Sequence, residues 1–197
     1  MTDAAILLTE DQYLERERLS ETKHELVHGV ITARAGATPL HNAIVMNVGV
    51  ALRNRLRGRC LVLPSDQRVH VEATRMYTYP DLTVVCDAPR FHPKDADTLL
   101  NPRVLVEVLS SSTEAYDRGA KFAHYQSIGS LEEYVLVTQA AKRVEHYRRL
   151  PTGQWLLTVS EGNDAMLELP ALGCEIPVSE IYEDTDLLDG AASRADP

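Results

Sequence analysis

The stretch Val104-Leu105-Val106-Glu107-Val108-Leu109 places one acidic residue in the middle of an otherwise apolar run. Apolar residues on both faces of the pleat are typical of a central strand that is covered on both sides. An ionised carboxylate is costly to bury in such a strand, so we expect Glu107 to be paired with a base, protonated or bound to a cation. The stretch therefore predicts a functional site as well as a central strand.

A second acidic residue, Asp81, opens another predicted strand in Pro80-Asp81-Leu82-Thr83-Val84-Val85. Two carboxylates on neighbouring strands can hold one divalent ion, because hard cations prefer carboxylate oxygens. There are simpler explanations for each acid. Aspartate after proline is common where a strand begins, and a buried glutamate can be satisfied by Arg or Lys alone. The residues leave both alternatives open.

The first half of the chain predicts helices and strands in alternation. Thr9 and Gln12 have the spacing of a capping box and predict a short first helix, with Leu8 and Tyr13 as a hydrophobic staple. We further expect two strands within His24–Ala33 that turn at His28-Gly29, a helix over Pro39–Leu56 that stops at Gly58, four strands and a loop. The strands are Cys60–Leu63, Arg68–Glu72, Leu82–Cys86 and Val104–Leu109, and the loop is Asp87–Pro102.

A helix is predicted between two central strands in the second half. Ser111 and Glu114 have capping-box spacing, but Gly119 favours a helix from Asp117 to about Ser127. Either start puts Lys121 and Tyr125 on the same helix face. Further strands are expected at Glu133–Thr138, Arg143–Arg149, Trp155–Val159, Met166–Leu169 and Cys174–Val178. The fold class is therefore α/β, a central mixed β-sheet flanked by helices with additional antiparallel strands.

Composition predicts one domain over residues 1–197, with an acidic tail at 180–197. The three cysteines, Cys60, Cys86 and Cys174, are odd in number and lack CxxC spacing. This pattern argues against a disulfide framework, and we expect Cys60 and Cys86 to be small core residues. A reduced, cytoplasmic protein without a membrane partner is expected, since the sequence contains no long apolar run.

The formal net charge of -9 appears unfavourable for binding nucleic acid, but the charge is unevenly distributed. The segment 180–197 holds six acids and one base, so it carries over half of the net charge. Basic clusters stand at 53–59 and in the pairs 142–143 and 148–149. Each is explained equally well by phosphate contact or by ordinary solvated charge.

The motifs resemble those of the Uma-two family of restriction endonucleases, within the PD-(D/E)XK nuclease superfamily. The resemblance runs from about residue 13 to about residue 178. It rests on these strings: Pro80-Asp81, Val106-Glu107-Val108-Leu109-Ser110, Ser112-Thr113, Tyr116-Asp117-Arg118-Gly119-x-Lys121-Phe122-x-x-Tyr125 and Glu133-Tyr134-Val135-Leu136-Val137. A bare PD…ExK pattern is a weak signal, whereas the extended string after Glu107 is specific.

The resemblance implies a restriction-endonuclease-like fold and Mg²⁺- or Mn²⁺-dependent hydrolysis of DNA phosphodiester bonds. Asp81, Glu107 and the Val108 carbonyl would be metal ligands, and Asp81, Glu107 and Lys121 would be catalytic. Glu25, His41 and Tyr125 are expected accessory residues. By analogy with the superfamily, and because the strand edges are many, we also expect a homodimer.

The sequence departs from the superfamily pattern at Leu109, which stands where the catalytic lysine is normally found. In the resembled family the lysine has moved to the following helix, where Lys121 would take its role. If Lys121 points elsewhere, the chain would still bind metal but catalyse poorly. Leu109 and the acidic charge also support a second hypothesis, a non-catalytic nucleic-acid-binding or regulatory module of the same fold. A metal-dependent phosphodiesterase acting on small substrates is a third hypothesis.

Overall fold

The computed structural model describes residues 7–34 and 36–188, and the last nine residues of the expected acidic tail lie outside this part. Its helices are α1 (Glu10–Arg18), α2 (Pro39–Leu56), α3 (Glu114–Tyr116), α4 (Phe122–Tyr125) and α5 (Val178–Ile181), with a π-helical turn, η1 (Asp117–Lys121), between α3 and α4. Its strands are β1 (His24–Val27), β2 (Val30–Ala33), β3 (Leu61–Pro64), β4 (Arg68–Val71), β5 (Met76–Thr78), β6 (Leu82–Val85), β7 (Phe91–His92), β8 (Asp95–Leu99), β9 (Val104–Val108), β10 (Glu133–Val137), β11 (Arg143–Arg149), β12 (Trp155–Glu161), β13 (Met166–Leu169) and β14 (Cys174–Pro177).

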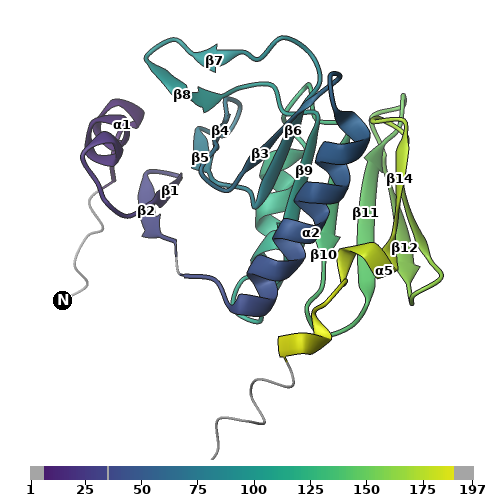
Figure 1. Ribbon diagram of the computed structural model, residues 1–197. Helices are drawn as coiled ribbons and strands as arrows, with labels where there is room; N and C mark the ends of the chain where they lie inside the picture. The colour runs from purple at the N-terminus through teal and green to yellow at the C-terminus, as the bar shows by residue number, and fades with distance from the viewer. Residues whose placement is uncertain (1–6, 35, 189–197) are drawn as a thin grey trace, which may run out of the picture.

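The central sheet has the strand order β12-β11-β10-β9-β6-β3, and Figure 1 shows it behind α2. Strands β9 and β10 run parallel, because the segment α3-η1-α4 crosses over between them. The other strand pairs of this sheet are antiparallel. The mixed sheet flanked by helices confirms the predicted α/β fold class.

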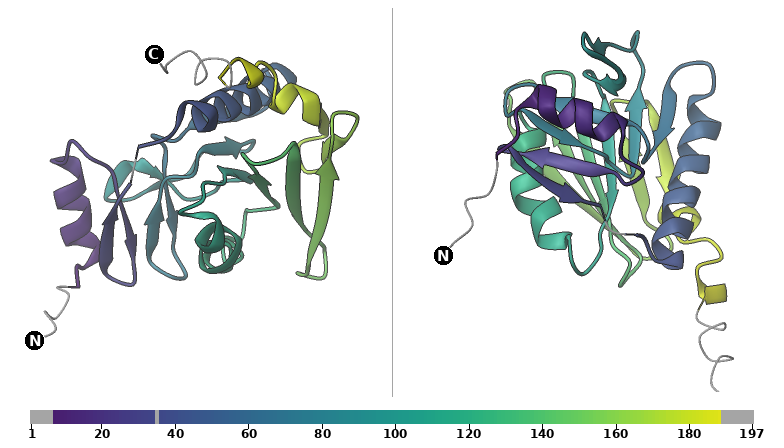
Figure 2. Two further views of the ribbon diagram at one scale, coloured as in Figure 1. Left: turned by 90° about the horizontal axis from the view of Figure 1, so that it is seen from below. Right: turned by 90° about the vertical axis from the view of Figure 1, so that its left-hand side faces the viewer.

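Helices cover both faces of the central sheet, as the left view of Figure 2 shows. Alternate side chains of β9 divide between the two faces, as expected for a strand. Val104, Val106 and Val108 pack in the same hydrophobic cluster as the buried face of α2. Leu105 and Leu109 belong to the cluster that contains Phe122 and Tyr125 from the crossover segment. Glu107 has the same parity as Leu105 and Leu109, so it faces the crossover segment.

Asp81 and Glu107 are neighbours across two antiparallel strands. Leu82 of β6 pairs with Val106 of β9. One further step in this register sets Asp81, just before β6, opposite Glu107. Side chains at directly opposed positions have Cβ atoms roughly 5 Å apart on the same face. The sheet register therefore brings the two predicted metal ligands together.

A second sheet has the strand order β2-β1-β5-β4-β8-β7 and contains the N-terminal hairpin. The hairpin turns at His28 and Gly29, which both have positive φ angles of 50° and 83°, as a tight two-residue turn requires. Helix α1 lies beside this hairpin (Figure 1) and has the predicted capping box between Thr9 and Gln12. This sheet supplies one wall of the pocket described below.

Two predictions from local pattern are wrong. The segment Asp87–Pro102 is not a loop, because it contains β7 and β8, which join the second sheet. Strand β8 includes three polar residues in five and gave no hydrophobic pattern, yet Asp95 is buried by an ion pair with Arg68. Strand β5 was also missed, since it is only three residues long.

The expectation that Cys60 and Cys86 are separate reduced thiols is also wrong. They form a disulfide, and Cys174 is the free cysteine. Leu61 of β3 pairs with Val85 of β6, so the next residues outward, Cys60 and Cys86, face each other. Strand register brought these cysteines together, which their number and sequence spacing did not reveal.

The C-terminal part of the described chain packs against α2. Arg55 of α2 forms a bidentate ion pair with Glu180, with Nη2 and Oε2 2.6 Å apart. One cluster of basic residues is thus partly neutralised within the molecule. Within residues 7–34 and 36–188, no helix has the length and apolar character needed to cross a membrane.

Candidate active site

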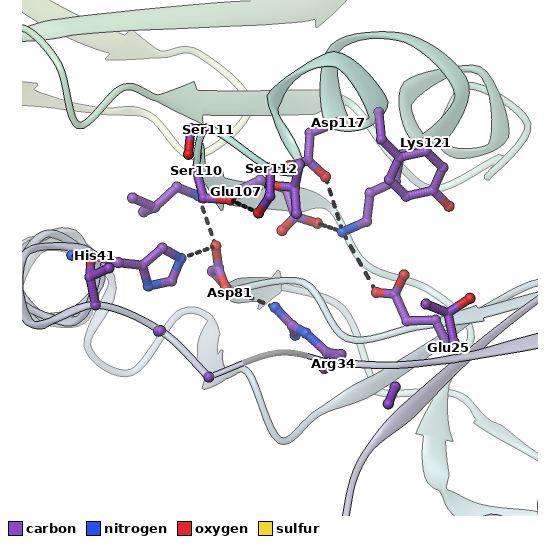
Figure 3. Close-up of a pocket in the computed structure, with 18 of the residues that line it drawn as sticks. Glu25, Arg34, His41, Asp81, Glu107, Ser110, Ser111, Ser112, Asp117 and Lys121 are labelled. Carbon is purple, nitrogen blue, oxygen red and sulfur yellow. Dashed lines mark hydrogen bonds and ion pairs between the residues drawn. The ribbon is translucent and has the colours of Figure 1, made fainter.

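A pocket of about 760 Å³ opens where the central sheet meets the N-terminal hairpin. Its lining brings together most of the residues predicted from the sequence. Among the side chains in its wall are Glu25, Arg34, His41, Asp81, Glu107, Val108, Asp117 and Lys121. Figure 3 shows that the charged side chains point toward one another from several different elements. Tyr125 lies behind the pocket wall and reaches the site through Glu107.

Glu107 is almost fully buried, with 2% of its surface exposed. Its Oε1 lies 2.8 Å from Lys121 Nζ and accepts a 2.9 Å hydrogen bond from the Tyr125 hydroxyl. Burial raises the pKa of Glu107 to about 7; Lys121 opposes the rise, and Asp81 and Asp117 add to it. The carboxylate is therefore paired and also able to hold a proton near neutral pH, two of the three states expected from the sequence.

Lys121 lies at the end of the π-helical turn, a local feature that is frequent at functional sites. Its Nζ is 2.8 Å from Glu107, 3.4 Å from Asp117 and 3.7 Å from Glu25. Burial alone would lower the pKa of Lys121, but these three carboxylates hold it well above its usual value. The ammonium is thus charged and surrounded by acids.

The crossover helix differs from its predicted form. It begins at Glu114 and passes through the π-helical turn before ending at Tyr125. The predicted capping box of Ser111 and Glu114 is wrong, because Thr113 is the N-cap and has no side-chain capping bond. The prediction that Lys121 and Tyr125 share a face is confirmed, since both contact Oε1 of Glu107.

Asp81 is held by donors from three different elements. Its Oδ2 accepts from the Val108 backbone N–H at 2.8 Å and lies 3.1 Å from Nε2 of His41, while Oδ1 is 3.2 Å from Nη2 of Arg34. Burial would raise the pKa of Asp81, but these contacts outweigh it and lower the pKa. The hydrogen bond to Asp81 in turn raises the pKa of His41. Asp81 is therefore firmly ionised.

Glu25 extends into the pocket from β1. Its Oε1 accepts a 2.6 Å hydrogen bond from Thr78 of β5 and a 3.4 Å one from the Tyr79 backbone. Burial would raise the pKa of Glu25, but Lys121 and Thr78 lower it overall. The structure thus brings the expected accessory residues Glu25 and His41 to the site, one beside the lysine and the other beside Asp81.

Two lining residues, Arg34 and Asp117, were given no role from the sequence. Asp117 has a local signal, because it precedes Lys121 by four residues and its side chain pairs with that lysine. Arg34 directly follows β2 and contacts Asp81, 47 residues further on. No local pattern predicts that contact, since it depends on how the hairpin packs against the central sheet.

The residues present fit a hard divalent cation. Within residues 7–34 and 36–188, there is no ready-made group of three or more His, Cys, Asp or Glu side chains that could hold a metal ion. Mg²⁺ does not need three protein ligands, because it keeps several waters and is usually bound through one or two carboxylates. Asp81 and Glu107 provide two carboxylates on one pocket wall, and the known contacts of Glu107 involve only Oε1. The set suits Mg²⁺ or Mn²⁺ better than a soft metal.

The fold and the pocket together define a restriction-endonuclease-like α/β protein. The sequence profile of the Uma2 family, described as "Putative restriction endonuclease", matches residues 10–179. The chain belongs to this family.

Two relatives come from Synechocystis sp. (strain ATCC 27184 / PCC 6803 / Kazusa). The protein sll1609 is 36% identical over 163 residues, which cover 82% of this chain and 92% of the relative. The protein slr1290 is also 36% identical, over 176 residues that cover 89% of this chain and 91% of the relative. Both matches extend over nearly the whole length of each protein.

A crystal structure from Anabaena variabilis ATCC 29413, described as "a putative nuclease belonging to DUF820", has a similar fold. The two structures superpose with a TM-score of 0.73, covering 89% of this chain and 97% of the other, at 18% sequence identity. This likeness confirms the predicted nuclease-like fold. The roles of the individual site residues stay predictions.

Proposed function

We propose that this protein is a metal-dependent endonuclease that hydrolyses phosphodiester bonds of DNA. One observation supports this function above all: Asp81, Glu107 and Lys121, which are distant in sequence, line the same pocket. Ion pairs satisfy Glu107 through Lys121 and Asp81 through Arg34 and His41, but these pairs do not explain why the two acids lie together on one pocket wall. Two acids and a lysine in one pocket match the requirements of metal-assisted phosphodiester hydrolysis.

In this proposal Asp81, Glu107 and the Val108 carbonyl hold Mg²⁺ or Mn²⁺. When bound, the ion would polarise a phosphate oxygen and lower the pKa of a coordinated water. The protein side chains then have distinct tasks. Asp81 stays ionised and provides constant charge, since its pKa is lowered by its hydrogen-bond donors. Glu107 is held in place on Oε1 by Lys121 and Tyr125.

Lys121 would orient the attacking water and stabilise the negative charge that develops on the phosphate. Its ammonium lies 2.8 Å from Oε1 of Glu107, so the lysine is adjacent to one of the two proposed metal ligands. The three surrounding carboxylates keep it protonated. Asp117 and Glu25 are positioning residues in this scheme, because they contact the lysine at 3.4 and 3.7 Å.

A second candidate function is a metal-dependent phosphodiesterase that acts on small substrates. The pocket volume of about 760 Å³ favours it, because pockets of roughly 300–1,000 Å³ are typical of small-molecule sites. The net charge of -9 points the same way. This candidate uses the same residues, and only the substrate separates it from the first.

The proposal includes a homodimer. Strand β12 is at the edge of the central sheet and exposes Leu156, Leu157 and Val159, each more than 40% accessible. Exposed apolar residues on an edge strand favour pairing with another copy. Sedimentation velocity would test this, and a monomer at all concentrations would contradict it.

The function is tested by incubating plasmid, linear duplex and single-stranded DNA with the protein in Mg²⁺ or Mn²⁺. Asp81→Asn, Glu107→Gln and Lys121→Met should each lower cleavage by roughly 100-fold or more. Asp164→Asn is a matched control, since Asp164 is exposed and far in sequence from the site. Full cleavage by Asp81→Asn and Glu107→Gln would refute the site. Hydrolysis of bis-p-nitrophenyl phosphate without DNA cleavage would favour the second candidate.

A further inference from the structure

In the proposed function Lys121 acts on the attacking water and the developing charge, but a buried lysine is not the cation that first contacts a phosphate entering the pocket. The Lys121 side chain is only 5% exposed, and its three nearest charged neighbours are all carboxylates. An ammonium has three hydrogens to donate. Most of its donor capacity is therefore directed at the protein's own acids.

Arg34 is the more accessible cation of this pocket, with 26% of its side chain exposed. It enters from the segment that follows β2, opposite the wall that carries Glu107 (Figure 3). Its Nη1 donates to the Tyr79 carbonyl, and its Nη2 is 3.2 Å from Oδ1 of Asp81. A guanidinium has five donors in a planar fork, which matches the oxygens of a phosphate.

The charges around Arg34 favour a cation there even before a ligand arrives. Burial alone would lower its pKa, but Glu107, Asp81 and Glu25 raise the pKa overall. The contact with Asp81 uses a carboxylate that, under the proposed function, also binds the metal. A divalent ion at Asp81 would compete with the guanidinium for the carboxylate. Metal binding would therefore release Arg34 toward the open side of the pocket.

We propose that Arg34 binds the phosphate of the substrate and is held on Asp81 until metal and substrate arrive. The inference rests on the proposed function and adds a substrate-contacting residue to it. A purely structural ion pair with Asp81 is the simpler alternative. The two explanations differ in their effect on the metal. If the ion pair is purely structural, Arg34 holds Asp81 in place for metal binding; if Arg34 is stored on Asp81 for the substrate, it competes with the metal for Asp81.

The first measurement is the affinity for DNA. A fluorescein-labelled 12-nucleotide single strand and a 12-base-pair duplex are titrated with protein in Ca²⁺, and a gel checks that the strands stay intact. We expect Arg34→Gln to weaken binding of at least one of these probes about tenfold or more. Arg34→Lys should have an intermediate effect, because it keeps the charge but loses the fork.

A matched control is Arg53→Gln. Arg53 lies in the last turn of α2, whereas His41 of the pocket lies in the first turn of the same helix. Arg53 is exposed, so removing it takes one positive charge from the protein surface without touching the pocket. Its DNA affinity should remain within about twofold of wild type.

The second measurement is the affinity for Mn²⁺ alone, by calorimetry without DNA. If Arg34 is stored on Asp81, Arg34→Gln binds Mn²⁺ as tightly as wild type or more tightly. If Arg34 only supports Asp81, the variant binds Mn²⁺ more weakly. Thermal unfolding of each variant identifies any protein that has lost its fold. If Arg34→Gln does not fold, Arg34→Lys replaces it in the comparison with wild type.

Two results would overturn the inference. One is unchanged DNA affinity in Arg34→Gln, or no DNA binding by the wild type. The other is a parallel loss of DNA and Mn²⁺ affinity. Unchanged DNA affinity in Arg34→Gln, or a parallel loss of DNA and Mn²⁺ affinity, leaves the nuclease proposal standing, because that proposal is judged by cleavage in the wild type and its loss in Asp81→Asn and Glu107→Gln. The two proposals can therefore fail separately, whereas a wild type that neither binds nor cleaves DNA would contradict both.

Discussion

Asp81 and Glu107 line the same pocket, but their surroundings shift the pKa values of the two carboxyl groups in opposite directions. Asp81 receives hydrogen bonds from a backbone N–H and two basic side chains, and its pKa is lowered. Burial raises the pKa of Glu107 to about 7, and its nearest cation, Lys121, is shared with Asp117 and Glu25 and offsets only part of the rise. Pairs of acids whose pKa values are driven apart are typical of acid–base sites. The contrast gives Asp81 a constant charge and Glu107 a variable one.

The contrast follows from where each acid stands in the sheet. Asp81 precedes β6, at a strand end that the N-terminus of α2 and the segment after β2 can both reach. Glu107 is an inner residue of β9, under the crossover segment, and its strand neighbours on that face, Leu105 and Leu109, belong to the hydrophobic cluster. A carboxylate at the end of a strand can be reached by hydrogen-bond donors from several elements. A carboxylate within a strand is reached only by long side chains such as Lys121.

The largest expected effect comes from removing the shared cation of the Glu107 side. Lys121→Met leaves three carboxylates around an empty position, and a buried charge without a partner is strongly destabilising. We expect the free energy of unfolding to fall by about 4 kcal/mol. Urea denaturation measures this value. In the double variant Lys121→Met/Glu107→Gln, part of the lost free energy of unfolding should be recovered. If the losses of the two single variants simply add, Lys121 is not the cation that Glu107 shares with the other acids.

The next effect compares the two acids directly in EDTA. Asp81→Asn loses charge-assisted hydrogen bonds and should lower stability by about 2 kcal/mol. Glu107→Gln removes a charge that burial disfavours, so its cost should stay below about 1 kcal/mol, or the variant should be more stable. Urea denaturation at pH 8 checks the pair. Equal losses would show that the two environments do not differ.

The sequence predicts the features of the site that depend on residues close together in the chain, and it predicts few contacts between residues far apart in the chain. Glu107 in an apolar strand was informative because the polarity of one residue conflicted with its neighbours. Lys121 and Tyr125 were predicted to act together because helical spacing is local. Asp81 was found through its position at the start of a strand and was joined to Glu107 as a possible metal ligand, and the family resemblance added the role of Lys121.

Contacts made through strand register and sheet packing were not predictable from local pattern. Arg34 reaches Asp81 only because the N-terminal hairpin brings the segment after β2 beside the start of β6. Cys60 and Cys86 meet through strand register, and β8 is a strand despite its polar residues because it pairs with β4 and β7. Pairing partners decide all three, and a single sequence does not reveal them.

A smaller effect is expected from the hydroxyl that supports Glu107. Tyr125→Phe removes the 2.9 Å hydrogen bond to Oε1 and should cost about 1 kcal/mol. Tyr134→Phe is the matched control, since its buried hydroxyl donates to the Asp117 backbone carbonyl instead. Thermal unfolding should show similar losses for both. Only Tyr125→Phe should also change the pH dependence of activity, and identical pH profiles would remove Tyr125 from the Glu107 side.

The smallest effect concerns His124 of α4, on the helix that covers the Glu107 side. Burial lowers the pKa of His124, and the nearby ring of His28 lowers it further. A lowered pKa means that the unfolded chain binds the proton more tightly, so stability falls as pH drops below the unfolded value of about 6.5. His124→Gln should lose less stability than wild type between pH 7.5 and about pH 5.5. Urea midpoints across this range measure the difference, and parallel curves would contradict it.

The central claim is that Asp81 and Glu107 bind one divalent ion together, and calorimetric titration with Mn²⁺ at pH 8 tests it directly. The wild type should bind Mn²⁺, and both Asp81→Asn and Glu107→Gln should lose this binding while remaining folded. The exposed-site control Asp164→Asn should bind as the wild type does. Unchanged Mn²⁺ affinity in either pocket variant, or no binding by the wild type, would show that the two acids are not a metal site.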